Sequence, residues 1–459
     1  MGWVRHASTG RHLVGGRVWR PRGMSDTGIT YLLWHDLVGV TRTRGVPSRD
    51  IERRYGSGLG WARAGQALTA FGNIVDNSWG PMDEVRQIPD RAAHFTIPGK
   101  GDLPDFNAVI CNSMAEPGMP WACCGRSFLA SALAELETET GLTIFASFEH
   151  EYSLTGRDFV PSSPFSIAAA RQKNDYLTEL EAALTTAGVT TYTLEPEYGS
   201  GQYEVACAPE MGMRAADACL IARETIREIS RRYGLQASFT PKPARDAVGN
   251  GAHIHLSLVQ PDGKNITWDA KGPMELSEVA AQFSAGILDH LDALLAITAP
   301  SPVSYFRLGP HHWSTGYRAI GLQNREAALR ITPGVGGEDA RRKGHNIEYR
   351  PCDGVASPYL VLGALVRAGL DGIRRGLSCP PGVTEDPADM SEEARQAAGI
   401  KALNTSLAAS LDALLADKTA CNWFGQEMLE VYIALKRWEV AAAAEWGEDT
   451  TFARYRDAY

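Results

Sequence analysis

Two glutamates spaced two residues apart are the first sign of chemistry in this chain. Glu149 and Glu151 lie in 143–154 (TIFASFEHEYSL), whose aromatic and apolar residues predict a buried strand. Because side chains alternate between the faces of a strand, both carboxylates point the same way. Carboxylates on one buried face repel each other and lose hydration, and Mg²⁺ or Mn²⁺ would relieve both penalties. The alternative is a rim strand whose carboxylates simply face water.

A second pair with the same spacing is made of histidines. His253 and His255 lie in 251–258 (GAHIHLSL), and Ser257 continues the same face of the predicted strand. A single buried histidine is usually a core residue, but two on one face favour a ligand site. The preceding Asn250 and Gly251 would let the backbone approach a bound ligand closely.

Further charged groups follow along the chain, and the arginines among them lie in its second half. Glu197 and Glu204 flank a Gly-Ser-Gly turn that can bring both carboxylates to one site, and Glu348 alternates with Arg350 in 346–351 (NIEYRP). Other arginines in this half are Arg307, Arg325 and Arg330. Arginines together with carboxylates and histidines are typical of a site that binds metal and phosphate.

The composition is that of an ordinary globular protein and excludes several classes. The chain has 459 residues, 44% hydrophobic and 22% charged, with a net charge of −9, which argues against nucleic acid as a partner. No apolar run approaches the ~20 residues that span a membrane. The eight cysteines show no metal-type pairing, so we expect reduced thiols and a cytoplasmic location.

Two domains are expected after a short N-terminal extension. Residues 1–26 hold five arginines and no acidic residue before Asp26, which fits a transit peptide or a misassigned start, and we expect them to be poorly ordered. Residues 27–124 predict a small β-rich domain. Residues 125–459 predict a larger domain of strands and long helices, the latter at 126–140, 167–187, 211–233, 276–298, 357–376, 391–416 and 424–445.

Taken in order, the motifs resemble the glutamine synthetase superfamily. They are FEHEY, EYGSGQYE, SFTPKP, GNGAHIHLSL, NREAALRI, NIEYRP and SPYL. The resemblance implies an α+β fold, with an N-terminal β-grasp domain and a larger catalytic domain built on a curved antiparallel sheet flanked by helices. It also implies a homo-oligomer, a dodecamer of two stacked hexamers with active sites between subunits.

The resemblance assigns roles residue by residue. One metal would be held by Glu151, Glu197 and Glu204, and the other by Glu149, His253 and Glu348. His255, Ser257, Arg330 and, less securely, Lys343 would lie on the nucleotide side. Arg307 would bind the glutamate α-carboxylate, with Asn250 and Gly251 lining that substrate. Arg325 and Arg350 would face the transferred phosphoryl group.

The implied reaction fits these residue types. ATP phosphorylates the γ-carboxylate of L-glutamate, and an amine then displaces phosphate. Bringing the anionic oxygens together requires arginines and two to three Mg²⁺ or Mn²⁺ ions per site.

One segment departs from the pattern of ammonia-using enzymes. Counting from Arg307, Trp313 occupies the position of the glutamate that guards the intermediate and helps deprotonate ammonium. A tryptophan makes a larger, more apolar pocket, which favours an organic amine as acceptor, with His311 or His312 as a base. The alternative is that a carboxylate from a neighbouring loop fills the gap.

Three functions remain open on the sequence. The first is an ATP-dependent ligase that joins glutamate to an alkyl-, poly- or arylamine. The second is an ordinary glutamine synthetase with an atypical segment at 308–314. The third is a catalytically silent relative, which is disfavoured because every inferred metal-ligand position holds a competent ligand.

Overall fold

The computed structural model describes residues 28–156, 159–311 and 314–459. The expectation that residues 1–26 are poorly ordered therefore lies outside the described residues. The N-terminal part forms a six-stranded sheet in which β6 pairs with β5 and β1 runs parallel to β5. Its order is β2(Thr41–Pro47), β1(Ile29–His35), β5(Phe106–Glu116), β4(Glu84–Ile97) and β3(Leu59–Ala62), with β6(Met119–Pro120) off this path.

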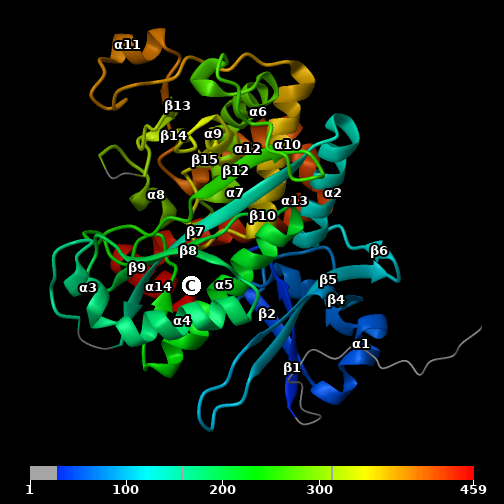
Figure 1. Cartoon of the computed structure of the whole chain (residues 1–459). Helices are drawn as coiled ribbons and strands as arrows, with labels where there is room; N and C mark the ends of the chain where they lie inside the picture. Colours follow the sequence, from blue (N-terminus) through cyan, green and yellow to red (C-terminus); the bar gives the residue numbers. More distant parts are fainter. Residues whose placement is uncertain (1–27, 157–158, 312–313) are drawn as a thin grey trace, which may run out of the picture.

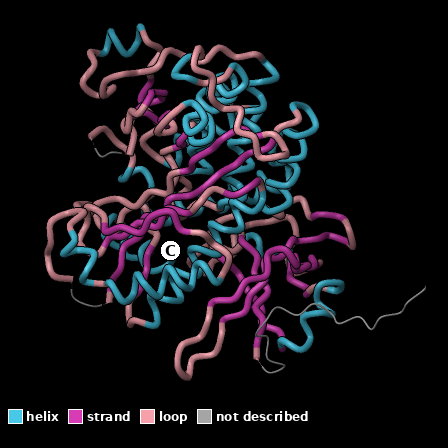
Figure 2. The backbone as a smooth tube through the Cα atoms, in the orientation of Figure 1, coloured by secondary structure: helices cyan, strands magenta, loops and turns pink. Residues whose placement is uncertain are grey.

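The rest of the chain is organised by a ten-stranded sheet, which confirms the α+β fold. Its order is β16(Lys401–Ala402), β13(Tyr317–Leu322), β14(Ala327–Thr332), β15(Asn346–Tyr349), β12(Ile254–Val259), β7(Thr143–Thr155), β9(Gln202–Cys207) and β8(Thr191–Pro196), while β10(Glu210–Met211) and β11(Gln236–Ser238) also pair with β7. The described pairings are antiparallel apart from β13 with β14. Figure 2 shows the two groups of strands as separate regions.

Strand β7 lies at the centre of the larger sheet and has one buried and one partly open face. Phe148, His150 and Tyr152 are almost completely buried, whereas Glu149 and Glu151 are only partly so. The apolar face packs into the core, so the alternation forces the two carboxylates onto the opposite face. This confirms the strand that the sequence predicted.

Helices pack against both sheets, the first of them on the N-terminal sheet and most of the others around the larger one. They are α1(Ile51–Ser57), α2(Gly125–Thr140), α3(Ile167–Gln172), α4(Asn174–Thr186), α5(Met213–Arg232), α6(Glu278–Asp289), α7(Leu291–Thr298), α8(Ser304–Arg307), α9(Glu338–Gly344), α10(Pro358–Arg375), α11(Glu392–Ala397), α12(Leu407–Ala416), α13(Lys418–Trp446) and α14(Glu448–Ala458). In Figure 1, β7 and β12 cross in front of α10 and α13. Helices α6 and α10 touch through glycines, because a Cβ on Gly286 would lie 2.1 Å from the Ala368 carbonyl oxygen.

Some expected helix boundaries are wrong. The single helix expected over 391–416 is two helices separated by β16, because Gly399 takes a left-handed conformation (φ 68°) and Ser406 caps a new helix at Ala409 N. The helix expected over 276–298 divides at His290, and that over 167–187 divides at Lys173.

Two findings bear on the expected environment. All eight cysteines are free thiols, as expected. Among the described residues, no helix is long and apolar enough to span a membrane.

Candidate functional site

Neighbouring strands bring the predicted ligands together by register. Glu151 on β7 lies opposite Glu204 on β9, and His255 on β12 lies opposite Glu348 on β15. Arg330 on β14 lies opposite Glu348 from the other side. Five strands therefore deliver their polar side chains to one part of the sheet.

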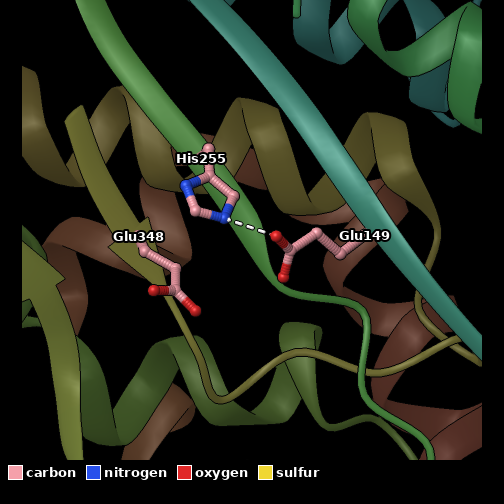
Figure 3. Close-up of side chains that lie close together, drawn as sticks. All are labelled: Glu149, His255 and Glu348. Carbon is pink, nitrogen blue, oxygen red and sulfur yellow. Dashed lines mark hydrogen bonds and ion pairs between the residues drawn. The ribbon is translucent and has the colours of Figure 1, made fainter. Parts of the chain in front are cut away.

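Glu149 lies between the two histidines. His255 Nε2 lies 3.0 Å from Glu149 Oε1, and His253 Nδ1 lies 3.2 Å from Glu149 Oε2 and 3.7 Å from Glu348 Oε1. Glu149, His255 and Glu348 each offer a ligand atom within 4.8 Å of the others, as Figure 3 shows. Both histidines are therefore close enough to Glu149 to share a cation with it, and the choice of His253 over His255 as ligand stays a prediction.

We call Glu149, His253, His255 and Glu348 the compensated half of the site. Positively charged side chains neutralise the carboxylates of this half. Arg330 Nη1 donates a 2.8 Å hydrogen bond to Glu348 Oε2, and Arg350 pairs with the other oxygen. Burial would raise the pKa of Glu149, but its hydrogen bonds with the histidines hold that pKa well below its usual value. Burial would raise the pKa of Glu348 too, but Arg350 and the histidines outweigh it.

We call Glu151, Glu197 and Glu204 the acidic half, because the main charged neighbours of Glu197 and Glu204 are other carboxylates. Burial and repulsion by Glu149 and Glu151 raise the pKa of Glu204 to about 10. Burial and repulsion by Glu151 raise the pKa of Glu197 to about 7. Such shifts show uncompensated negative charge, which is the electrostatic environment that a divalent cation requires.

Gly251 lies where these groups converge. Its N–H donates a 2.8 Å hydrogen bond to Glu151 Oε2. A Cβ on Gly251 would lie 3.1 Å from His253 Nε2, 3.2 Å from Arg307 Nη1 and 3.3 Å from Glu151 Oε1. Any larger residue would press on all three side chains, which explains a glycine at this position.

Arg307 and Asn250 are each fixed by hydrogen bonds to other parts of the chain. Arg307 is 4% exposed, and its Nη2 donates to the carbonyl oxygen of Cys352 at 2.7 Å. Asn250 is completely buried, and its amide bonds Gln202, Ser153 and the Thr240 carbonyl. Asn250 therefore uses its side chain to fix the loop before β12.

The predicted nucleotide-side residues lie next to the compensated half. Ser257 Oγ donates to the carbonyl oxygen of His345 at 3.2 Å, and Lys343 lies in α9, immediately before β15. Asn346 Oδ1 lies 2.8 Å from His255 Nδ1, so it orients the ring that faces Glu149. Asn346 was not predicted from the sequence, although it lies two residues before Glu348 and therefore shares a strand face with that ligand.

Arg325 and His311 lie together in a separate cleft. The residues that line it include Asn324, Glu385 and Asp386, and His311 Nδ1 lies 3.2 Å from Asp386 Oδ2. His312 and Trp313 lie outside the described residues. The predicted roles of these four residues stay predictions.

The donor set fits two divalent cations. Oxygen ligands dominate, with imidazole nitrogen beside them, and this combination suits Mg²⁺ or Mn²⁺. The buried His253 Nε2 finds no hydrogen-bond partner among the described residues, so this nitrogen is available as a ligand. A site with paired cations, arginines and carboxylates can support phosphoryl transfer.

Comparisons with known proteins agree with this geometry. Residues 122–455 match the family described as glutamine synthetase, catalytic domain. The gamma-glutamylpolyamine synthetase GlnA3 of Streptomyces coelicolor is 33% identical over 438 residues, which cover 93% of each chain. The glutamine synthetase of Methanocaldococcus jannaschii is 31% identical over 397 residues, 84% of this chain and 83% of that protein.

Solved structures give the same result. A glutamine synthase homolog superposes with a TM-score of 0.86 at 36% identity and covers 96% of this chain and 100% of its own. A complex of GmaS with ADP superposes with a TM-score of 0.79 at 25% identity, covering 92% of this chain and 94% of its own. The chain belongs to the glutamine synthetase family and is an ATP-dependent ligase.

Proposed function

We propose that this ligase joins the γ-carboxylate of L-glutamate to an organic amine through γ-glutamyl phosphate. One observation carries the choice of acceptor. Glu197, a carboxylate of the acidic half, lines a small hollow together with Phe159, Tyr198 and Tyr203. The aromatic rings beside this metal-ligand carboxylate suit the apolar body and the cationic head of an organic amine.

The reaction proceeds in two displacements. A γ-carboxylate oxygen of glutamate attacks the γ-phosphorus of ATP, and ADP leaves. The amine nitrogen then attacks the carbonyl carbon, the carbon–oxygen bond to phosphate breaks, and the nitrogen gives a proton to a base, for which His311 and His312 are the candidates.

The chain's own residues position these groups. Arg307 holds the α-carboxylate of glutamate, while Arg330 and Arg350, which pair with Glu348, face the phosphoryl oxygens. Arg325 lines the separate cleft, and its role toward the phosphoryl group rests on the family resemblance alone. Ser257, His255 and Lys343 lie on the nucleotide side.

The metal ligands divide between the two halves of the site. The acidic half (Glu151, Glu197 and Glu204) and the set Glu149, His253 and Glu348 would each hold one divalent cation, and a bound cation supplies charge neutralisation for the phosphoryl oxygens.

An assembly of subunits is part of the proposal. Apolar side chains that are more than half exposed lie in the same segments of this chain as the residues that line the hollow, including Val160 (68%), Ile167 (76%) and Tyr198 (62%). Exposed apolar groups of this kind are typical of a protein interface. A dodecamer of two stacked hexamers would cover them, and light scattering coupled to gel filtration measures the mass.

A second candidate is an ammonia-using glutamine synthetase. Glutamine synthetases of 31% and 30% identity among the relatives favour it.

The test is ADP release that requires both glutamate and an amine, with the γ-glutamyl product identified by mass. We expect Phe159→Ala to raise the KM for an organic amine about tenfold, since ring contacts contribute ~1 kcal/mol or more. The KM values for glutamate and ATP should change little, and Phe95→Leu in the N-terminal core serves as a control. Release of ADP with ammonium alone would support the second candidate.

A further inference from the structure

A buried carboxylate behind Arg307 has no part in the function described so far. Asp353 is completely buried, and its Oδ2 finds no hydrogen-bond partner among the described residues. Its other oxygen accepts the N–H of Val355 at 3.1 Å. A buried ionised group is costly unless an opposite charge lies near, so its position requires an explanation.

The backbone on both sides of Asp353 is held by two buried arginines. Arg307 Nη2 donates to the Cys352 carbonyl oxygen at 2.7 Å, and Arg223 Nη1 donates to the Ala356 carbonyl oxygen at 3.0 Å. Each guanidinium also has a buried Nε with no hydrogen-bond partner in the described part of the chain. Two buried arginines therefore hydrogen-bond the backbone before and after Asp353, and Asp353 supplies the carboxylate of this segment.

Asp353 and Arg307 are each other's leading charged neighbour. Burial lowers the pKa of the Arg307 guanidinium, and Asp353 opposes that shift more than any other charge. Burial raises the pKa of the Asp353 carboxyl, and Arg307 is the charge that opposes this most. The two side chains therefore have favourable electrostatic contact inside the protein.

The two ends of the Arg307 guanidinium have different surroundings. Nη2 is anchored on the segment that leads to Asp353, whereas Nη1 lies toward Gly251, at the point where His253 and Glu151 also meet. The Cys352 carbonyl also accepts the N–H of Ala252 at 2.9 Å, which ties the Asp353 segment to the loop before β12.

We infer that Asp353 is a positioning residue for substrate binding: its buried carboxylate fixes the segment that anchors Arg307, so that the Nη1 edge of this guanidinium is aimed at the substrate carboxylate. The inference rests on the proposed role of Arg307 in glutamate binding. Asp353 itself touches no substrate.

The test compares Asp353→Asn with a matched control, Asp217→Asn. Asp217 is also buried and accepts two hydrogen bonds from Arg126 at 2.8 and 3.0 Å, far from Arg307 in sequence. Calorimetry of L-glutamate binding in the presence of an ATP analogue and Mg²⁺ should show a Kd raised about ten- to a hundredfold for Asp353→Asn. The control should lower Tm but leave this Kd unchanged.

A double mutant separates positioning from general destabilisation. In an Arg307→Lys background, adding Asp353→Asn should weaken glutamate binding by less than threefold, because the guanidinium that Asp353 positions is already absent. The KM for ATP should stay within twofold throughout. If Asp353→Asn does not fold, Asp353→Glu keeps the charge but displaces it, and the same rise in Kd is expected.

Unchanged glutamate binding in Asp353→Asn, with Arg307→Ala impaired, would overturn the inference and leave the function intact. Equal, additive losses in both backgrounds would overturn it as well. If wild type and every variant bind glutamate alike and none of them forms a γ-glutamyl product, the proposed function itself fails.

Discussion

The compensated half and the acidic half of the site contain similar carboxylates in opposite electrostatic states. Glu348 is 1% exposed, and burial would raise its pKa, yet Arg350 and the two histidines keep that pKa below the usual value. Glu204 is 9% exposed, and its neighbours are Glu149, Glu151 and Glu197, so its pKa rises to about 10. The fold therefore compensates one half with its own cations and leaves the other half dependent on a bound cation.

Removing one ligand from each half should abolish activity in both. We predict that Glu151→Ala and His253→Ala each lower ATP turnover more than about a thousandfold, since a lost cation forfeits several kcal/mol of charge stabilisation. Gel filtration should show the assembly intact. Near-wild-type turnover of either variant at limiting metal would refute the ligand assignment.

Loss of Arg307 should act on glutamate binding. This arginine lies at the border of the two halves, near both Glu151 and His253 through Gly251. Arg307→Ala should cost about 2–4 kcal/mol, seen mainly as a raised KM for glutamate, because a charge-assisted contact with the α-carboxylate is lost. Steady-state kinetics with glutamate and ATP varied separately will check this, and an unchanged glutamate KM would give Arg307 another role.

Glu348→Gln and Glu204→Gln should shift metal-free stability in opposite directions. Neutralising Glu348 leaves Arg330 and Arg350 beside a neutral group, which should lower Tm by several degrees. At pH 8 the folded protein must keep Glu204 protonated while the unfolded chain releases that proton, so Glu204→Gln removes this cost and Tm should rise by a few degrees. Differential scanning fluorimetry in EDTA measures both, and shifts of the same sign would show that the halves do not differ.

The pH dependence of metal-free stability sharpens this contrast. Because the folded-state pKa values of Glu197 and Glu204 are raised to about 7 and about 10, the folded protein holds protons that the unfolded chain releases above about pH 4.5. Tm should therefore fall as pH rises from about 5 toward 9, and saturating Mn²⁺ should remove most of that fall. A metal-free Tm that is flat over this range would contradict the raised values.

The smallest effect concerns Trp313. Trp313→Glu should weaken use of an organic amine by about 1–3 kcal/mol through lost apolar contact, and it should improve use of ammonium. The ratio of kcat/KM for the two acceptors measures this, with glutamate and ATP kinetics as the control. An unchanged ratio would remove Trp313 from the acceptor site.

The ligand strands could be predicted from the sequence because side chains two residues apart in the sequence share a face of the folded strand. Glu149 and Glu151 share a face of β7, and Glu348 reaches His255 through strand register. Helix ends were harder, since Gly399 and Ser406 divide a stretch whose periodicity alone predicts one helix. Asp353 could not be identified, because its importance depends on burial between Arg223 and Arg307, which are 84 residues apart in the chain.

The central claim is that this ligase uses an organic amine, and acceptor kinetics test it most directly. The measurement is kcat/KM at saturating glutamate, ATP and Mg²⁺ for ammonium, methylamine, ethylamine, a diamine and aniline. We predict that at least one organic amine exceeds ammonium by tenfold or more, as ~1.4 kcal/mol of added contact would give. A preference for ammonium over every amine tested would contradict the claim and make the protein an ammonia-using glutamine synthetase.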